Sequence, residues 1–209
     1  MLEAEERMVD QPDFAAAQQY ALGRLERELD PRLRYHSLAH TRDDVLPAVE
    51  RLAALGRLYG EDLLLLRTAA LFHDLGFLVS RASHEAQGVA IAAALLPTFG
   101  YRPAQVEQIG AMIRATRLPQ SPQSLLEQIL ADADLDLLGR TDFLERNRML
   151  REELRAFGDD TTDEAWYDGQ IKFMTQHRYW TPAARALREP QKARNIEVLR
   201  ALLAARRLL

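Results

Sequence analysis

The sequence has 209 residues and a formal net charge of −4, from 27 basic and 31 acidic side chains. This length suits a single domain with a full hydrophobic core. Cysteine is absent, which excludes disulfides, cysteine-ligated zinc and thiol nucleophiles. The mildly acidic charge, with arginines scattered along the chain, gives no basic surface for duplex nucleic acid, so we expect no such partner.

No segment has the pattern of an export signal or a membrane span. Residues 1–11 are acidic and lack the basic-then-apolar order of a signal peptide. No apolar stretch approaches the roughly 20 residues that a membrane helix needs. We therefore predict a cytoplasmic protein with no membrane association.

The composition predicts an all-α protein. There are 35 leucines and 31 alanines but only 7 valines and 6 isoleucines. Leucine and alanine lose little side-chain freedom in a helix, whereas β-branched residues favour strands.

The spacing of apolar residues predicts a single-domain bundle of eight or nine helices. Residues 1–11 are expected to form a flexible lead-in and residues 12–209 a single all-helical domain. Ser83 and Thr141 are the expected N-caps of two helices, and Gly60 is expected to end another. In chain order the helices are expected at about 14–30, 38–59, 61–76, 83–96, 103–116, 124–138, 141–157, 163–177 and 182–208.

One expected helix, 61–76, is apolar on nearly every side. A helix without a polar face belongs in the middle of a bundle. The dipeptide His73–Asp74 ends this helix, and burying an imidazole and a carboxylate is unfavourable unless each has a partner. A carboxylate is also disfavoured near a helix C-terminus, so a bound cation would resolve the difficulty.

Histidines gather in one part of the chain, where four of the five lie between positions 36 and 84. His36 and His40 are four residues apart and share a face if a helix begins this early. By itself this spacing is common on solvated helix faces, and it gains meaning only from the residues around it.

Besides the two segments with histidines, an acidic segment contains Asp132, Asp134 and Asp136 among apolar residues. Alternate positions on a helix lie roughly 200° apart, so the three carboxylates cannot share one face. At least one of them should face the core, where it needs a cation or hydrogen-bond donors. Together, these imidazoles and carboxylates suit Mn, Fe, Ni or Zn, with Mg as a further candidate at an oxygen-rich second position.

The ordered set of these segments resembles the HD-domain superfamily of metal-dependent phosphohydrolases. The resemblance covers roughly residues 35–140, and the stretch with Phe173 and His177–Thr181 is similar to a subgroup of small bacterial predicted phosphohydrolases. The matching segments are Tyr35–His40 (YHSLAH), Ala69–Gly76 (AALFHDLG), His84–Glu85 and Asp132–Asp136 (DADLD).

The resemblance implies an all-helical fold that holds a divalent metal. The ligands that it implies are His40, His73, Asp74 and Asp134, with Asp132 as the reserve candidate and His84 as a candidate for a second ion. His36 matches a position that donates a proton in related cyclic-nucleotide phosphodiesterases. The sequence departs from the family pattern at Ser37, where many relatives have Asn, and at residues 116–119, which lack a second-site histidine found in some members.

The activity expected from this resemblance is hydrolysis of a phosphoester by metal-activated water. His36 would act as general acid, while Glu85 would orient the water or tune His84. The candidates for binding phosphate are the arginines near the motifs, although 25 arginines in the chain make a surface role the alternative for each. They are Arg81, Arg114, Arg117 and Arg140.

The expected substrate is a nucleotide or another small phosphorylated metabolite. The alternative is a non-catalytic sensor that binds a metal or nucleotide on the same fold. Retention of His36 beside the implied ligands favours catalysis, because a binding module needs no proton donor. The long C-terminal helix, rich in Leu and Ala, is a candidate surface for a homodimer.

Overall fold

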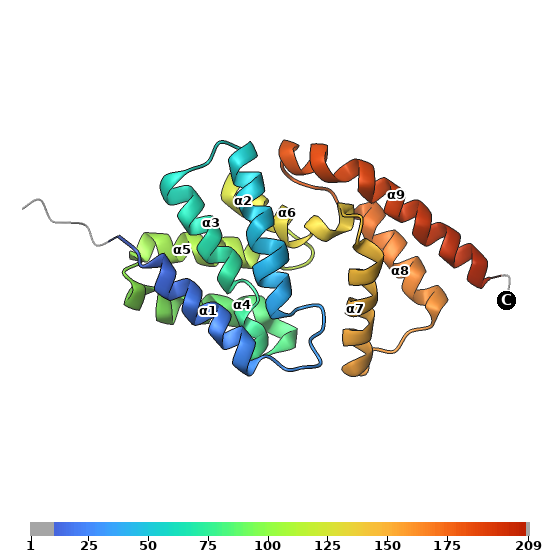
Figure 1. Cartoon of the computed structure of the whole chain (residues 1–209), viewed down its shortest axis with the longest axis horizontal. Coiled ribbons are helices and arrows are strands. Elements are labelled where there is room, and N and C mark those ends of the chain that lie inside the picture. The colour runs from blue at the N-terminus through green and yellow to red at the C-terminus, as the bar shows by residue number, and fades with distance from the viewer. Residues whose placement is uncertain (1–10, 208–209) are drawn as a thin grey trace, which may run out of the picture.

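The computed structural model of the protein describes residues 11–207 (Figure 1). Over this range the chain forms nine α-helices, joined by short 3-10 turns and one π-helical turn, and contains no strand. The prediction of an all-α fold is confirmed. The expected flexible lead-in falls, apart from Gln11, outside the described residues.

The helices follow the predicted order. They are α1 (Phe14–Glu28), α2 (Leu46–Leu55), α3 (Gly60–Phe72), α4 (His84–Leu95), α5 (Pro103–Ala115), α6 (Leu125–Asp134), α7 (Phe143–Ala156), α8 (Asp163–Gln176) and α9 (Pro182–Arg206). The shorter turns are the π-helical η1 (His40–Val45) and the 3-10 turns η2 (Leu75–Leu78), η3 (Arg81–Ser83), η4 (Leu96–Phe99) and η5 (Asp136–Gly139).

The helix α3 occupies the middle of the bundle, as its apolar sequence predicts. It contacts α1, α2, α4, α5 and α6. From Leu65 to Phe77 every residue except Arg67 is buried. Figure 1 shows α7, α8 and α9 grouped at the other end of the molecule, beyond α2, where α8 packs along α9. No helix in the described part of the chain is long and apolar enough to cross a bilayer.

Two predicted helices are interrupted. The segment expected as one helix over 38–59 opens with the π-helical turn η1, and Pro47 then lies in the first turn of α2, where a missing N–H is tolerated. The segment expected over 124–138 breaks at Leu135, between α6 and η5. The break has a tertiary cause, because Asp134 and Asp136 bind partners in different parts of the molecule.

One of the two predicted N-caps is confirmed in position. Ser83 is the N-cap residue of α4, but its hydroxyl donates to the Ser80 hydroxyl (3.2 Å) and makes no capping bond to the helix. The residue before α7 is Asp142 rather than Thr141. The carboxylate of Asp142 is held by Arg140 instead of capping the helix, so local sequence preference was overridden by an ion pair.

Gly76 lies where η2 meets the start of α4. A Cβ at this position would lie 1.8 Å from the carbonyl oxygen of His84 and 2.7 Å from the amide nitrogen of Gly88. We expect Gly76→Ala to lower the free energy of unfolding by about 2 kcal/mol or more, because backbone must move to admit the methyl group. Gly169→Ala is the control: nothing lies within 4 Å of its Cβ, and it should stabilise α8 by about 0.5–1 kcal/mol. Urea unfolding of both variants measures the difference, and equal stabilities would contradict this account of Gly76.

Candidate metal centre and adjoining cavity

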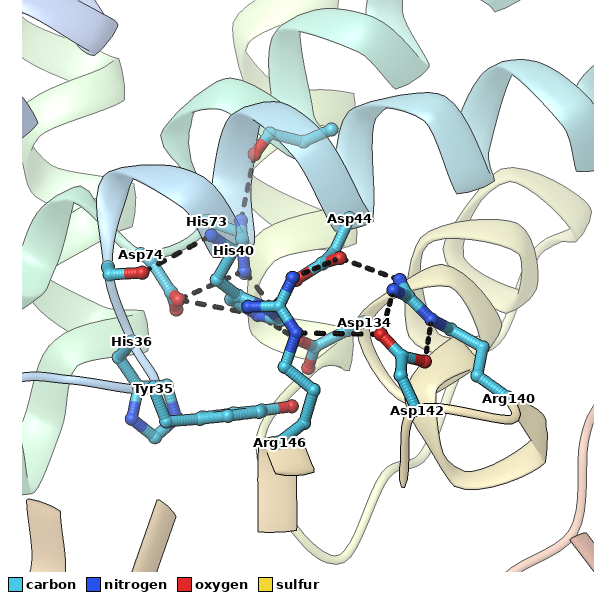
Figure 2. Close-up of polar contacts among 12 residues, drawn as sticks. Tyr35, His36, His40, Asp44, His73, Asp74, Asp134, Arg140, Asp142 and Arg146 are labelled. Atoms are coloured by element: carbon cyan, nitrogen blue, oxygen red, sulfur yellow. Dashed lines mark hydrogen bonds and ion pairs between the residues drawn. The ribbon is translucent and has the colours of Figure 1, made fainter. Parts of the chain in front are cut away.

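Four side chains from separate segments converge at the centre of the bundle (Figure 2). His40 comes from η1, His73 and Asp74 follow α3, and Asp134 ends α6. Nε2 of His73 lies 3.2 Å from Oδ2 of Asp74 and 3.6 Å from Oδ1 of Asp134. Nε2 of His40 lies 3.3 Å from the same oxygen of Asp134 and 3.7 Å from Oδ2 of Asp74. Two imidazoles therefore face two carboxylates.

The ring of His73 is held in one orientation. Its Nδ1 lies 2.8 Å from the carbonyl oxygen of Ala70, which can only accept, so Nδ1 carries a proton. In the neutral ring, the lone pair of Nε2 then faces the carboxylate of Asp74. Among the described residues, neither His73 Nε2 nor Asp74 Oδ2 has a hydrogen-bond partner, although both are buried. Two buried acceptors that face each other require a proton or a cation between them.

The pKa values of the cluster show the same demand for positive charge. Burial by itself would lower the pKa of His73, but the charges of Asp74 and Asp134 raise it well above its usual range. Burial would raise the pKa of Asp74. The neighbouring imidazoles, of which His73 has the largest effect, nevertheless hold the pKa of Asp74 below its ordinary value. Imidazole nitrogen and carboxylate oxygen are ligands that Mn, Fe, Ni and Zn accept, so these residues fit a divalent metal.

Asp44 links the cluster to two arginines. Its Oδ2 lies 3.9 Å from Nδ1 of His40, on the side of the ring away from Asp134. Its Oδ1 accepts hydrogen bonds from Arg140 (2.6 Å) and Arg146 (3.1 Å). Arg140 also binds Asp142, whose hydrogen bond is the main cause of the raised pKa of Arg140. Such outer contacts orient metal-binding imidazoles.

The three aspartates of the 132–136 segment have different surroundings. Asp132 is 1% exposed and accepts from the backbone N–H groups of Trp180 (2.7 Å) and Thr181 (2.8 Å), which places it at the start of α9. Asp136 is bound by arginines of α2 and α9. Only Asp134 faces the histidines, so the structure brings together the four preferred ligand candidates and sets the reserve, Asp132, apart.

His36 lies beside the cluster and is paired with Glu153 of α7. The His36 Nδ1 and Glu153 Oε1 are 2.5 Å apart. The other oxygen of Glu153 accepts from the backbone N–H groups of Tyr35 (2.8 Å) and His36 (3.0 Å). Burial would lower the pKa of His36, but the hydrogen bond to Glu153 and the nearby carboxylates outweigh it and raise the pKa. With Nδ1 bound to Glu153, Nε2 is the nitrogen left for proton transfer.

Three rings stack next to this pair. The rings of His36 and Phe77 are 4.5 Å apart, and those of Phe77 and His84 are 4.0 Å apart. Nε2 of His84 lies 3.9 Å from Asp74 and 3.6 Å from Glu85. His84 and Glu85 therefore border the cluster, at a longer distance than His40 and His73.

A cavity of about 520 Å³ opens onto the cluster. Its polar lining includes His36, Asp74, His84, Glu85 and Asp134, together with Arg81 and Arg117. Its apolar lining comes mainly from η5, α7 and α8. Of the arginines proposed to bind phosphate, Arg81 and Arg117 line this cavity, whereas Arg114 and Arg140 do not.

Sequence reasoning missed Glu153 and Asp44. Glu153 is 117 positions from His36, and no local pattern separates it from the other acidic residues of the chain. Asp44 had a usable signal, because it follows His40 by four residues and such pairs lie on one helical face.

The comparisons with known proteins agree with this geometry. The family model of the HD domain matches residues 45–136. The chain is similar to the crystal structure of a predicted HD superfamily hydrolase from an uncultured Thermotogales bacterium, with a TM-score of 0.63 and 22% identity over 93% of each chain. No match was found among curated proteins. At this identity the solved structure shows a shared fold, and the family match includes the His73–Asp74 dipeptide. The resemblance predicted from the sequence is thus confirmed: residues 45–136 match the HD domain, and the chain shares its fold with a predicted HD superfamily hydrolase.

Proposed function

We propose that this protein is a metal-dependent hydrolase that cleaves a phosphoester. The observation that carries the proposal is the pair of buried, unpartnered acceptors, His73 Nε2 and Asp74 Oδ2, beside a cavity that is lined by Asp74 and by His36, the partner of Glu153. Buried acceptors of this kind need a proton or a cation between them, and a metal ion satisfies both; the proton donor beside them, His36, favours a reaction in which a bond is broken.

The residues that would hold the metal are His40, His73, Asp74 and Asp134. A bound divalent ion lowers the pKa of a coordinated water toward neutrality and polarises a phosphoryl oxygen. The mixed nitrogen and oxygen set suits Mn, Fe, Ni or Zn.

Other residues of the cavity supply the remaining functions. His36 donates a proton from Nε2 to the departing oxygen of the ester, while Glu153 holds its Nδ1. Arg117 and Arg81 bring positive charge to the cavity wall, where they attract the phosphate group. Glu85 holds the ring of His84 near Asp74 and faces the same space.

The test is a comparison of metal-free and metal-loaded protein. Loading with Mn, Ni or Zn is expected to bind about one ion per chain and to raise the melting temperature, because a ligand at 100 times its dissociation constant stabilises the folded state by about 2.7 kcal/mol. The loaded protein is then assayed for release of alcohol and phosphate from a panel of nucleotides, cyclic nucleotides and sugar phosphates. EDTA should abolish any turnover.

Two outcomes would contradict the proposal. A protein that neither binds nor is stabilised by these ions has no metal centre. A protein that binds a metal and a nucleotide tightly, yet turns over nothing in the panel, is the non-catalytic sensor instead.

A further inference from the structure

The cavity beside the cluster has one wall that the reaction at the metal centre does not use. Leu137 and Leu138 of η5 form part of it, with residues of α7 and α8 opposite the polar segments near α3 and α4. The lining residues that α7 and α8 contribute are Phe143, Asn147, Leu150, Gln170 and Phe173. None of the lining residues from η5, α7 and α8 carries a charge, so this wall favours an uncharged group.

Two amides interrupt this apolar wall, and their orientation can be deduced. The indole nitrogen of Trp166 can only donate, and it lies 3.0 Å from Oδ1 of Asn147. Nδ2 of Asn147 therefore faces Gln170, whose Oε1 accepts from it at 2.6 Å. Because Oε1 of Gln170 is used in this way, its Nε2 group is left as the donor, and across residues 11–207 no protein acceptor is bonded to it.

The chain of hydrogen bonds from Trp166 through Asn147 to Gln170 thus fixes the amide of Gln170, so that its N–H donors lie at one place on an apolar wall. Gln170 itself is half-buried, and Asn147 behind it is buried. A donor held this way recognises a hydrogen-bond acceptor, and an analogue without the acceptor leaves the donor unpaired. The positively charged lining residues, Arg81 and Arg117, lie outside this wall, so the wall does not suit further phosphate groups.

We propose that this wall binds the organic part of the phosphorylated substrate, and that this part is uncharged, largely apolar, and has a hydrogen-bond acceptor that receives the N–H of Gln170. The inference rests on the proposed function for the position of the phosphate, but it concerns binding and can be tested without turnover. The cavity volume of about 520 Å³ is within the range of small-ligand pockets.

The test uses phosphonates, which are not hydrolysed, with calorimetry on the manganese-loaded protein. Benzylphosphonate is expected to bind about tenfold or more tighter than methylphosphonate, with a more negative heat-capacity change, because its ring is buried against the apolar wall. 4-Acetylbenzylphosphonate should bind about threefold to tenfold tighter again through its carbonyl oxygen. 2-Hydroxyethylphosphonate, whose organic part is small and polar, should gain little over methylphosphonate.

Two variants, each with its own control, assign these gains in affinity to the wall. Gln170→Leu should remove the preference for the acetyl compound and keep the preference for benzylphosphonate over methylphosphonate. Gln176→Leu, on the exposed end of the same helix, should change neither. Leu150→Asn should reduce the benzyl preference, and Leu144→Asn, at a more exposed position of α7, is its control.

Equal affinities for benzylphosphonate and methylphosphonate in the wild-type protein would overturn the inference, and this comparison depends on no variant. An acetyl preference that survives Gln170→Leu would overturn the assignment of the donor. Retained phosphonate preferences in a protein that hydrolyses no phosphoester would support this inference while contradicting the proposed function, so the two failures can be distinguished.

Discussion

Asp74→Asn is expected to lower the affinity for a divalent metal by more than about 100-fold and to abolish turnover with it. Outer contacts of a metal site are worth 10- to 100-fold in affinity, and a residue that supplies a ligand atom and a full negative charge should be worth more. The unpartnered Oδ2 of Asp74 faces Nε2 of His73, and an amide in this place lacks the charge that attracts the cation. Metal content and calorimetric titration measure the loss.

The aspartates of the 132–136 segment supply a matched comparison. Asp134→Asn should also weaken metal binding, because Asp134 faces both histidines of the cluster. Asp132→Asn should retain the metal and instead lower the stability, because Asp132 accepts hydrogen bonds from Trp180 and Thr181 at the start of α9. If Asp132→Asn loses the metal and Asp134→Asn keeps it, the proposed set of ligands is wrong.

The sequence predicted much of this fold because the signals are local. Helix order followed from apolar spacing and from the abundance of Leu and Ala, and the position of α3 followed from its lack of a polar face. Helix boundaries were less predictable, because the break at Leu135 depends on an ion pair between distant segments, and at the start of α7 Asp142 binds Arg140 instead of capping the helix.

The candidate site was predictable to a similar extent. His73 and Asp74 could be predicted as site residues because two ionisable side chains follow an apolar helix, where their burial is unfavourable without a partner. The choice between Asp132 and Asp134 needed the family resemblance, because helical periodicity shows only that one carboxylate must face inward. Glu153 could not be predicted, since its contact with His36 exists only once the fold has placed α7 beside the segment that precedes η1.

The pairing of His36 with Glu153 leads to a second prediction, made for a panel of phosphoesters that differ in leaving group. Glu153→Gln and His36→Ala should both retain the metal, because neither residue is one of the four ligand candidates. His36→Ala should slow the hydrolysis of esters with poor leaving groups by about 100-fold or more, the usual contribution of a general acid. Nitrophenyl esters, whose leaving groups need little protonation, should be affected far less.

The pH dependence separates the positioning role of Glu153 from a merely structural one. A general acid works in its protonated form, so the rate on a poor leaving group should fall as the pH rises through the pKa of His36. Glu153 raises that pKa through its hydrogen bond to the ring, so Glu153→Gln should move the fall in rate to lower pH. Glu152→Gln, a neighbouring exposed substitution, is the control and should leave the profile unchanged. Equal losses on nitrophenyl and alkyl esters, or an unmoved profile in Glu153→Gln, would mean that this pair does not deliver the proton and that the leaving group takes it from solvent.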